Sequence, residues 1–352
     1  RVYDKKNGMA SIMQAIAIEN CSLVVREVLR PTLSEGEVLV QVCATSVNRA
    51  DLLQAAGRYP PPPGASTVLG LECSGTIVAF HDSRVDCGPD LLDGHRFAVG
   101  DRVCALLVGG GYAEYAVVPI ALLVPLPEEI PLAIGGAVCE VWMTALQLVH
   151  TEGGLRAGQS VIVHAAGSSV GKAAIQLAVA GGATTVVATA GTEAKLEVAK
   201  RLGATHCVSR HAEGGWIDEM ERAGVAAGTV DLILDPVGAS YWESNAAAIA
   251  VDGTHVLYGL MGGGALSAST PVLASVLRKR ITLRGTTLRT RALEYKAELA
   301  RTMRASVLPA IASGAFEVVV DRTLPLREAQ AAHELVCANA NNGKIVLLVR
   351  AE

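Results

Sequence analysis

Hydrophobic and polar positions change their spacing once along the chain, near Pro131. Between Met13 and about Ile120, short runs rich in β-branched residues are separated by turn residues, which is typical of β-strands. These runs are MQAIAI, LVVREVL, EVLVQVCATSV, CSGTIVAF, DRVCALL and YAEYAVV. Two polar loops interrupt them, one at residues 59–64, whose prolines cannot donate to a sheet, and one at residues 82–100. The first part of the chain is therefore expected to be β-rich.

From Pro131 onward, apolar residues at helical spacing alternate with short strand-like runs. The expected strands are SVIVHAAG, TTVVATAG, THCVS, VDLILDPVG and THVLYGLMGGG, and the expected helices cover about residues 171–182, 193–204 and 241–253. This alternation predicts a parallel sheet with helices on both faces. After the run ITLRGTTLR come a long helix over about residues 293–313, a strand FEVVVDRTLP, a helix REAQAAHELVCAN and a strand GKIVLLVR. This tail resembles the first part of the chain again.

The pattern predicts an α/β chain of two domains. Residues 13–140 and 290–352 are expected to form one domain, and residues 141–289 the other. Residues 1–12 are polar and begin with Arg1, so they are expected to be a vector-derived or N-terminal extension.

Composition fits this organisation. At 352 residues the chain can form two cores, and 51% hydrophobic with 18% charged residues is a globular composition. The net charge of -4 gives no basic footprint, so nucleic acid is not an expected partner. Apolar runs end before ~18 residues and no signal region is visible, so no membrane partner is expected and the expected location is cytoplasmic. The eight cysteines form no C-x-x-C pair and are expected to be mostly reduced core thiols.

The stretch SVIVHAAGSSVGKAAIQLA, residues 160–178, joins an apolar strand to a helix through very small residues. Such a turn lets backbone N–H groups and the helix dipole approach a pyrophosphate, so it predicts a dinucleotide-binding site. In the usual G-x-G-x-x-G register, the three positions are Ala166, Ser168 and Gly171. Because two of the three glycines are replaced, the motif alone is a weak indication.

The strand after this helix bears on the choice of coenzyme. A site that prefers NAD carries an Asp or Glu at the end of that strand, ~20 residues beyond the turn, to bind the ribose 2′-OH. Here Ala190, Gly191 and Thr192 occupy those positions, whereas Lys195 and Arg210 can supply charge to a 2′-phosphate. NADPH is therefore the expected cofactor. Two alternatives remain open: Lys195 can be an ordinary solvated lysine, and the glutamate of GTEAK can bind a ribose hydroxyl.

Several segments give the chain a likeness to a known family. They are ATSVNRADLLQAAGRYPPPPGASTVLGLECSG, ALLVGGGYAEY, EVWMTALQL, VIVHAAGSSVGKAAIQLA, LILDPVGASYWE, LYGLMGGG and NNGKIVLLV. In these segments the sequence resembles the zinc-independent medium-chain dehydrogenases/reductases, in particular quinone oxidoreductases of the zeta-crystallin group and the tumour-suppressor-inducible type within it. The resemblance covers nearly everything from Met13 onward. It implies a GroES-like β-rich catalytic domain and a Rossmann doubly wound parallel-sheet domain that binds NADPH.

The resemblance also bears on metal. Zinc-dependent members of the family have a cysteine where this chain has Asn48 and a histidine where it has Leu71, and their four-cysteine structural-zinc loop has no counterpart here. A catalytic zinc ion needs three or four converging Cys, His or acidic ligands. The resemblance therefore implies a site without metal.

Without metal, hydrogen-bond donors must polarise a substrate carbonyl, or the substrate must be electrophilic enough to need little help. The resemblance implies that Asn48, Asp51 and Tyr59 line the cleft between the domains. Asn48 would donate through its amide, and the Tyr59 phenol would orient or protonate the substrate oxygen. Two structural alternatives remain open: Asn48 and Asp51 can serve only to cap the helix RADLLQAAG, and Tyr59 can serve only in loop packing.

The resemblance implies a larger set of coenzyme-binding residues. The turn offers backbone N–H groups, and the glycine-rich run after a later strand lies where open parallel sheets bind ligands. Glycine runs are, alternatively, often only turns. The expected set is Thr144, Ala166, Ser168, Ser169, Val170, Gly171, Gly191, Thr192, Lys195, Arg210, Tyr258, Gly259, Met261, Gly262 and Gly263.

The expected activity is NADPH-dependent reduction of quinones. Reduction of α,β-unsaturated carbonyl compounds fits the same residues, and an NADPH-binding sensor or structural protein with little turnover is the alternative of another class. A hydrolase is not an expected class. The resemblance further implies a homodimer in which the strand at about residues 281–288 pairs with its counterpart, and that segment is a β-rich run with an exposed-edge liability.

Overall fold

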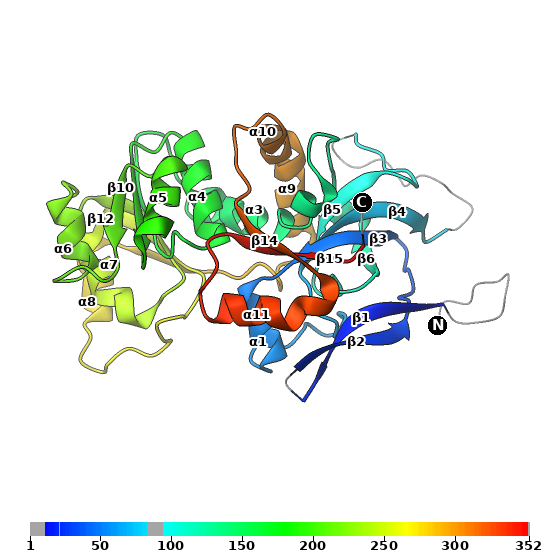
Figure 1. The fold of residues 1–352 in the computed structure, drawn as a ribbon. Coiled ribbons are helices and arrows are strands. Elements are labelled where there is room, and N and C mark those ends of the chain that lie inside the picture. Colours follow the sequence, from blue (N-terminus) through cyan, green and yellow to red (C-terminus); the bar gives the residue numbers. More distant parts are fainter. Residues whose placement is uncertain (1–10, 21, 83–93, 351–352) are drawn as a thin grey trace. The chain divides into compact units, whose positions relative to one another are not determined.

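The computed structural model of the chain describes residues 11–20, 22–82 and 94–350. They divide into two compact units. Unit 1 runs to Met143 and resumes at Arg289, and unit 2 is Thr144–Leu288. The colours of Figure 1 follow the sequence from the N-terminus to the C-terminus. The expectations for residues 1–10, and those for residues 83–93 of the second polar loop, lie outside the described residues.

Unit 1 is built mainly from β-strands. Its larger sheet has the order β14-β15-β3-β4-β5-β7, with β6 also paired to β3, and β1 and β2 form a separate antiparallel pair. The strands are β1 (Ile12–Glu19), β2 (Ser22–Leu29), β3 (Glu37–Ser46), β4 (Glu72–Phe80), β5 (Arg102–Leu106), β6 (Tyr115–Pro119), β7 (Leu123–Pro125), β14 (Val320–Pro325) and β15 (Lys344–Leu348). The helices are α1 (Arg49–Ala55), α2 (Leu132–Gly135), α3 (Cys139–Leu146, which continues into unit 2), α9 (Leu293–Thr302), α10 (Leu308–Ala312) and α11 (Ala329–Cys337).

Strand β3 is buried on both faces, which explains its nearly continuous apolar sequence. Val38, Val40 and Val42 are fully buried in the main core cluster of unit 1, and Leu39 and Cys43, at alternate positions of the strand, are buried as well. Because both sides of the strand are packed, its end at Ser46 is held firmly, and α1 begins three residues later. The start of α1 is therefore a rigid place from which to present side chains.

Unit 2 is a six-stranded parallel sheet in the order β10-β9-β8-β11-β12-β13. Its strands are β8 (Ser160–Val163), β9 (Thr185–Ala190), β10 (His206–Ser209), β11 (Val230–Asp235), β12 (Ile249–Leu257) and β13 (Thr282–Gly285). Its helices are α4 (Ser169–Ala180), α5 (Glu193–Arg201), α6 (Trp216–Arg222), α7 (Trp242–Ala248) and α8 (Val272–Lys279). Counted within the unit, this is the strand order of a doubly wound dinucleotide-binding sheet, so the predicted parallel α/β architecture is confirmed.

Two expected helices differ from the structure. The helix expected at residues 241–253 ends at Ala248, and β12 begins at Ile249, where β-branched side chains favour an extended strand. The long helix expected at residues 293–313 is interrupted by a π-helical turn, Met303–Val307, between α9 and α10. Pro309, the second residue after this turn, cannot donate a backbone hydrogen bond to it.

Candidate functional site

Apart from Thr144, the coenzyme-binding residues expected in unit 2 follow strands of its parallel sheet, at the carboxyl edge. From β8 the chain proceeds to β9 and β10 on one side, and then to β11, β12 and β13 on the other side. Open α/β sheets bind ligands at the point where the strand order reverses in this way, outside the carboxyl ends of the strands. The turn after β8, residues 164–168, lies at that point.

Small residues allow the turn after β8 to approach α4 closely. A Cβ atom on Gly171 would lie 2.8 Å from the backbone of Ala165 and Ala166, so only glycine fits there. The hydroxyl of Ser168 caps α4 by accepting the N–H of Gly171 at 3.0 Å. The N–H of Ala166 donates to the carbonyl oxygen of Thr189 at 2.9 Å and is thus used within the protein. Gly171 therefore performs the packing function of the third glycine in the usual motif.

Two basic side chains lie along the same edge, each against a glycine. A Cβ on Gly167 would come within 2.6 Å of Cδ of Lys195, and a Cβ on Gly191 would come within 2.7 Å of Nε of Arg210. Lys195 and Arg210, both expected from the sequence to bind the coenzyme, thus lie beside the turns after β8 and β9. Gly167 was not in the expected set, although its place between two expected turn residues was a usable signal.

The remaining expected coenzyme residues of this edge take several local positions. Ser169 and Val170 form the first turn of α4, and Thr192 is the residue before the first turn of α5. Tyr258 directly follows β12, and burial raises the pKa of its phenol. Thr144, within α3, is the first residue of unit 2.

The glycine-rich run after β12 packs closely against the segment after β11. Three backbone hydrogen bonds join them: Met261 to Pro236 at 3.1 Å, Gly262 to Val237 at 2.7 Å, and Ala239 to Gly263 at 2.9 Å. A Cβ on Gly259 would lie 2.7 Å from the carbonyl oxygen of Pro236. Close backbone packing therefore explains the glycines of this run, and it forms part of the same sheet edge.

A buried polar network joins the ends of the central strands of unit 2. Asp235, at the end of β11, accepts hydrogen bonds from Asn245 and from His255, each at 3.0 Å. The amide oxygen of Asn245 lies 2.7 Å from Nε2 of His164, and burial lowers the pKa of His164 to about 4. A neutral His164 donates to Asn245 through Nε2. The two histidines thus hold the strand ends in place.

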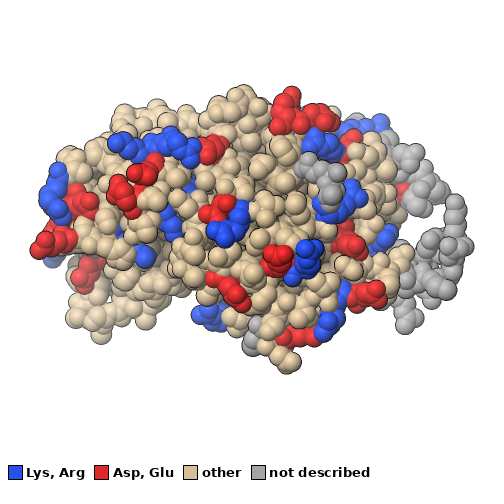
Figure 2. Space-filling model, viewed as in Figure 1, with Lys and Arg blue, Asp and Glu red and all other residues tan. Residues whose placement is uncertain are grey.

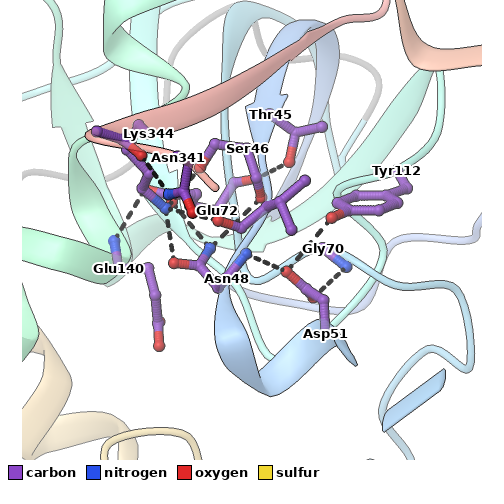
Figure 3. Close-up of polar contacts among 12 residues, drawn as sticks. Thr45, Ser46, Asn48, Asp51, Gly70, Glu72, Tyr112, Glu140, Asn341 and Lys344 are labelled. Atoms are coloured by element: carbon purple, nitrogen blue, oxygen red, sulfur yellow. Dashed lines mark hydrogen bonds and ion pairs between the residues drawn. The ribbon is translucent and has the colours of Figure 1, made fainter. Parts of the chain in front are cut away.

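Glu72 is the centre of a buried polar network in unit 1 (Figure 3). Its Oε1 atom accepts hydrogen bonds from Nζ of Lys344 at 2.7 Å, from the hydroxyl of Ser46 at 2.5 Å and from Nδ2 of Asn48 at 3.0 Å. Its Oε2 atom accepts the backbone N–H of Glu140 at 3.0 Å. One ammonium group therefore balances the buried carboxylate, and hydrogen bonds satisfy both of its oxygens.

The amide of Asn48 is held from both ends. It donates to Glu72, and its oxygen accepts from Nζ of Lys344 at 2.6 Å. Asp51 is fully buried, and it accepts the N–H of Asn48 at 2.8 Å and the N–H of Gly70 at 3.1 Å. Burial raises the pKa of Asp51 to about 6. These contacts favour the capping alternative for Asp51 and place the amide of Asn48 in the network of Glu72.

Tyr59 lies beside a buried arginine that no sequence pattern indicated. The guanidinium carbon of Arg289 is 5.4 Å from the centroid of the Tyr59 ring. Nε and Nη2 of Arg289 donate to the carbonyl oxygen of Val108 at 2.9 and 2.7 Å, and Nη2 also donates to Gln54 at 2.7 Å. The contacts join positions far apart in the chain, so no local pattern marks Arg289.

Glu140 adds an acid to this part of unit 1. Its backbone N–H is fixed by Glu72, and its side chain points away from the Glu72 network in Figure 3. Burial, and then the carboxylate of Glu72, raises the pKa of Glu140 to about 8. Its charge is close enough to act on Tyr59 and Arg289. We refer to Tyr59, Glu140 and Arg289 as the Tyr59 cluster. Glu140 was present in the segment EVWMTALQL but was not recognised as a functional residue.

Three further observations concern metal binding, membrane-spanning helices and surface charge. Leu71 is a buried apolar side chain with 1% exposure, and in the part of the chain that the structure describes no three His, Cys, Asp or Glu side chains converge to hold a metal ion. Within the same residues, no helix has the length and apolar character needed to cross a bilayer. On the face drawn in Figure 2, acidic and basic side chains are interspersed.

Two family models match the two parts of the chain. The model described as "Alcohol dehydrogenase GroES-like domain" matches residues 34–128, and the model described as "Zinc-binding dehydrogenase" matches residues 169–304. A quinone oxidoreductase of Rattus norvegicus is 28% identical over 325 residues, which are 92% of this chain and 92% of that protein.

Similar solved structures align with this chain over nearly its whole length. An NAD-dependent alcohol dehydrogenase is 29% identical with a TM-score of 0.78, and the match covers 96% of this chain and 100% of the other. A mycobacterial protein in complex with NADPH is 27% identical with a TM-score of 0.78, and the coverage is again 96% and 100%. The chain belongs to the medium-chain dehydrogenase/reductase family, with a GroES-like domain and a Rossmann-like parallel-sheet domain. It is an oxidoreductase of that family.

Proposed function

We propose that this protein reduces quinones with NADPH and without a metal ion. The observation that carries the proposal is the Glu72 network: Lys344 balances the buried carboxylate, and the amide of Asn48 is bound to both groups. Zinc-dependent members of the family have a ligand at the position of Asn48, where this chain has an amide already held by neighbours. The 28% identity to a rat quinone oxidoreductase over 92% of both chains supports the choice of substrate.

Quinones need little activation for this reaction. Transfer of a hydride from reduced nicotinamide adds two electrons and one proton to the quinone, and the resulting hydroquinone anion takes a second proton. NADPH, a quinone and one proton thus become NADP⁺ and a hydroquinone. Hydrogen-bond donors suffice to stabilise the developing negative charge, since the aromatic product delocalises it. The Tyr59 cluster contains such donors.

The preference for NADPH is the part of the proposal that rests on unit 2. Gly191 and Thr192 follow β9 where an NAD-preferring site has an acid, and Lys195 and Arg210 lie against the glycines of the same edge. Two cations and no repelling carboxylate at this position suit a ribose 2′-phosphate. Similar solved structures differ in their coenzyme, as one is described as NAD-dependent and another contains NADPH.

A spectrophotometric assay tests the proposal. The loss of NADPH absorbance is followed with 1,2- and 1,4-quinones, then with α,β-unsaturated ketones and aldehydes, in parallel with NADH. Turnover of quinones with NADPH, unchanged after extensive treatment with a zinc chelator, is the expected result. Loss of activity on chelation would overturn the metal-free part, and tight NADPH binding with no turnover of any substrate would support a sensor or structural protein.

Reduction of α,β-unsaturated carbonyl compounds is a second candidate that one observation favours. Hydride addition to such a substrate requires a proton beside the carbonyl group, and Glu140 has a pKa of about 8 and so carries a proton at neutral pH. Faster turnover of enones than of quinones, together with loss of that activity in E140Q, would favour this candidate.

We also propose that two copies of the chain associate through the outer edge of unit 2. Strand β13 is the last strand of its sheet, and all four of its residues are exposed. Helix α8, which contacts β12, exposes Leu273 by 83% and Leu277 by 79%. Exposed apolar side chains beside an open strand edge suit a second copy that covers both.

A further inference from the structure

Arg289 contains a buried donor that its protein neighbours leave unused. Arg289 is 5% exposed as a residue, and Nη1 has no hydrogen-bond partner within residues 11–20, 22–82 and 94–350. The other donors, Nε and Nη2, are held by Val108 and Gln54. A buried charged group with an unsatisfied donor costs free energy, so native structures normally supply an acceptor.

The guanidinium is rigid, which fixes the direction of the free donor. Two hydrogen bonds to the carbonyl oxygen of Val108 and one to Gln54 hold its planar fork. Both partners are neutral, so the positive charge is not balanced by either of them. Two acids, Asp51 and Glu140, are close enough to act on Arg289. The carboxylate of Asp51 accepts the N–H groups of Asn48 and Gly70, and the raised pKa of Glu140, about 8, keeps Glu140 protonated at neutral pH. The electrostatic environment therefore favours a negatively charged oxygen near Nη1.

We propose that Nη1 of Arg289 donates the hydrogen bond that binds the carbonyl oxygen of the substrate and stabilises it as it becomes a phenolate. This inference rests on the proposed quinone reduction, and it makes Arg289 a catalytic residue of that reaction. The ligand chemistry is specific: a flat, conjugated ring whose oxygen gains negative charge.

The neighbours of Arg289 suit a ring better than a phosphate group. One free N–H can bind one oxygen atom, whereas phosphate recognition uses several donors or a bidentate fork. The aromatic ring of Tyr59 lies 5.4 Å from the guanidinium carbon, so an aromatic face borders the site. The basic residues suited to coenzyme phosphate, Lys195 and Arg210, belong to unit 2. A phenolate oxygen can accept the hydrogen bond of Nη1 while the flat ring that carries it packs against the ring of Tyr59.

A preorganised charged donor of this kind acts on the rate more than on substrate binding. The hydrogen bond strengthens as the oxygen becomes an anion, so its removal lowers kcat more than it raises the KM for the quinone. Loss of one oxyanion donor typically costs about 10²–10³-fold in kcat. The KM for NADPH is expected to stay unchanged in Arg289→Ala.

Phenolate binding tests the site without catalysis. Titration of the full-length protein with 4-nitrophenol is followed by the visible absorbance of the phenolate form, and 4-cyanophenol serves as a less acidic probe. The wild type is expected to lower the apparent pKa of bound 4-nitrophenol, and Arg289→Ala is expected to abolish that shift. An unchanged shift in Arg289→Ala would overturn the proposal.

Two further variants separate donation from structural support. Arg291→Ala is the matched control, because Arg291 is two residues away and also lies over a tyrosine ring, that of Tyr295, at 4.5 Å. It is expected to behave as the wild type. Gln54→Leu removes one anchor of Arg289 and keeps the donor, so it should retain most of the phenolate shift. Equal loss in Gln54→Leu and Arg289→Ala would assign Arg289 a purely structural role.

Chemical rescue completes the test. Guanidinium ion added to Arg289→Ala is expected to restore a large part of kcat and of the phenolate shift, whereas urea at the same concentration is not. Absence of rescue in a variant that unfolds at the wild-type temperature would count against donation by Nη1. If the wild type binds phenolates through Arg289 and yet reduces no quinone, the binding of a phenolate oxygen by Arg289 stands, whereas its catalytic role and the proposed function fail. Quinone turnover that is insensitive to Arg289 would instead overturn the inference and leave the proposed function standing.

Discussion

The ammonium of Lys344 lies 2.7 Å from the carboxylate of Glu72, with side-chain exposures of 3% and 0%. The two residues begin β15 and β4, which are separated in the sheet only by β3. Removal of the cation alone leaves a buried carboxylate without a counter-charge. Lys344→Met is therefore expected to lower the free energy of unfolding by about 3–5 kcal/mol, measured by denaturant titration.

The double variant Glu72→Gln/Lys344→Met serves as the comparison for this pair. It removes both charges, so it should recover much of the loss. The exposed pair Arg280–Asp252, with both side chains 64% exposed, is the matched control, and Asp252→Asn should leave the unfolding transition unchanged. A Lys344→Met variant as stable as the wild type would contradict a stabilising role for this ion pair.

Lys195 and Arg210 are expected to determine the preference for NADPH. In Lys195→Ala and Arg210→Ala, the KM for NADPH should rise about 10–100-fold, as expected for the loss of a charged hydrogen bond to phosphate, while the KM for NADH changes little. Steady-state kinetics with both coenzymes measures the difference. Lys200→Ala, on the same helix α5, is the control and should affect neither KM. Equal effects on NADPH and NADH would contradict a role in 2′-phosphate binding.

Glu140 is expected to make the protein less stable as the pH rises. The unfolded carboxyl loses its proton near pH 4.5, and the folded one near pH 8, so between these values the folded state binds more protons. Stability conferred by protonated Glu140 is thus full below about pH 4.5 and is lost as the pH rises through 8. E140Q lacks this dependence, since an amide does not titrate.

Denaturant titrations at about pH 5 and pH 9 measure this effect. Between these two pH values, the free energy of unfolding of the wild type should fall by about 2–4 kcal/mol more than that of E140Q, because each pKa unit corresponds to about 1.4 kcal/mol. Glu128→Gln is the control, because Glu128 is 89% exposed and should alter neither value. The same pH dependence in E140Q and the wild type would assign the proton uptake to another group.

The apolar surface of α8 is expected to hold two copies of the chain together. Leu273→Glu combined with Leu277→Glu should convert the dimer to a monomer, because it places two carboxylates in an apolar contact. Sedimentation equilibrium gives the mass directly. Val99→Glu, at an exposed apolar residue of unit 1 with 43% exposure, should leave the dimer intact. A wild-type chain that sediments as a monomer would refute the association.

Local sequence spacing was sufficient for most of the fold. In β3 and the neighbouring strands, apolar residues either alternate with polar ones or form short continuous runs, as is typical of strands in a sheet. Between β8 and α4 the residues are small, which predicts a tight turn. The boundary between α7 and β12 was wrong, because the small residues of α7 continue into a β-branched run with no capping signal between them. Short-range propensity does not determine such a boundary.

The sequence by itself determined the α/β architecture, the turn at Gly171 and the absence of an acid at residues 190–192, since each depends on residues close together in the chain. Only the tertiary structure joined Arg289 to Val108 and Gln54, which are 181 and 235 residues away, and only it buried Glu140 beside Glu72. The direction of the unused donor and the raised pKa depend on burial and distance between remote segments. Burial of this kind arises only when the sheet has assembled, so no sequence motif could reveal it.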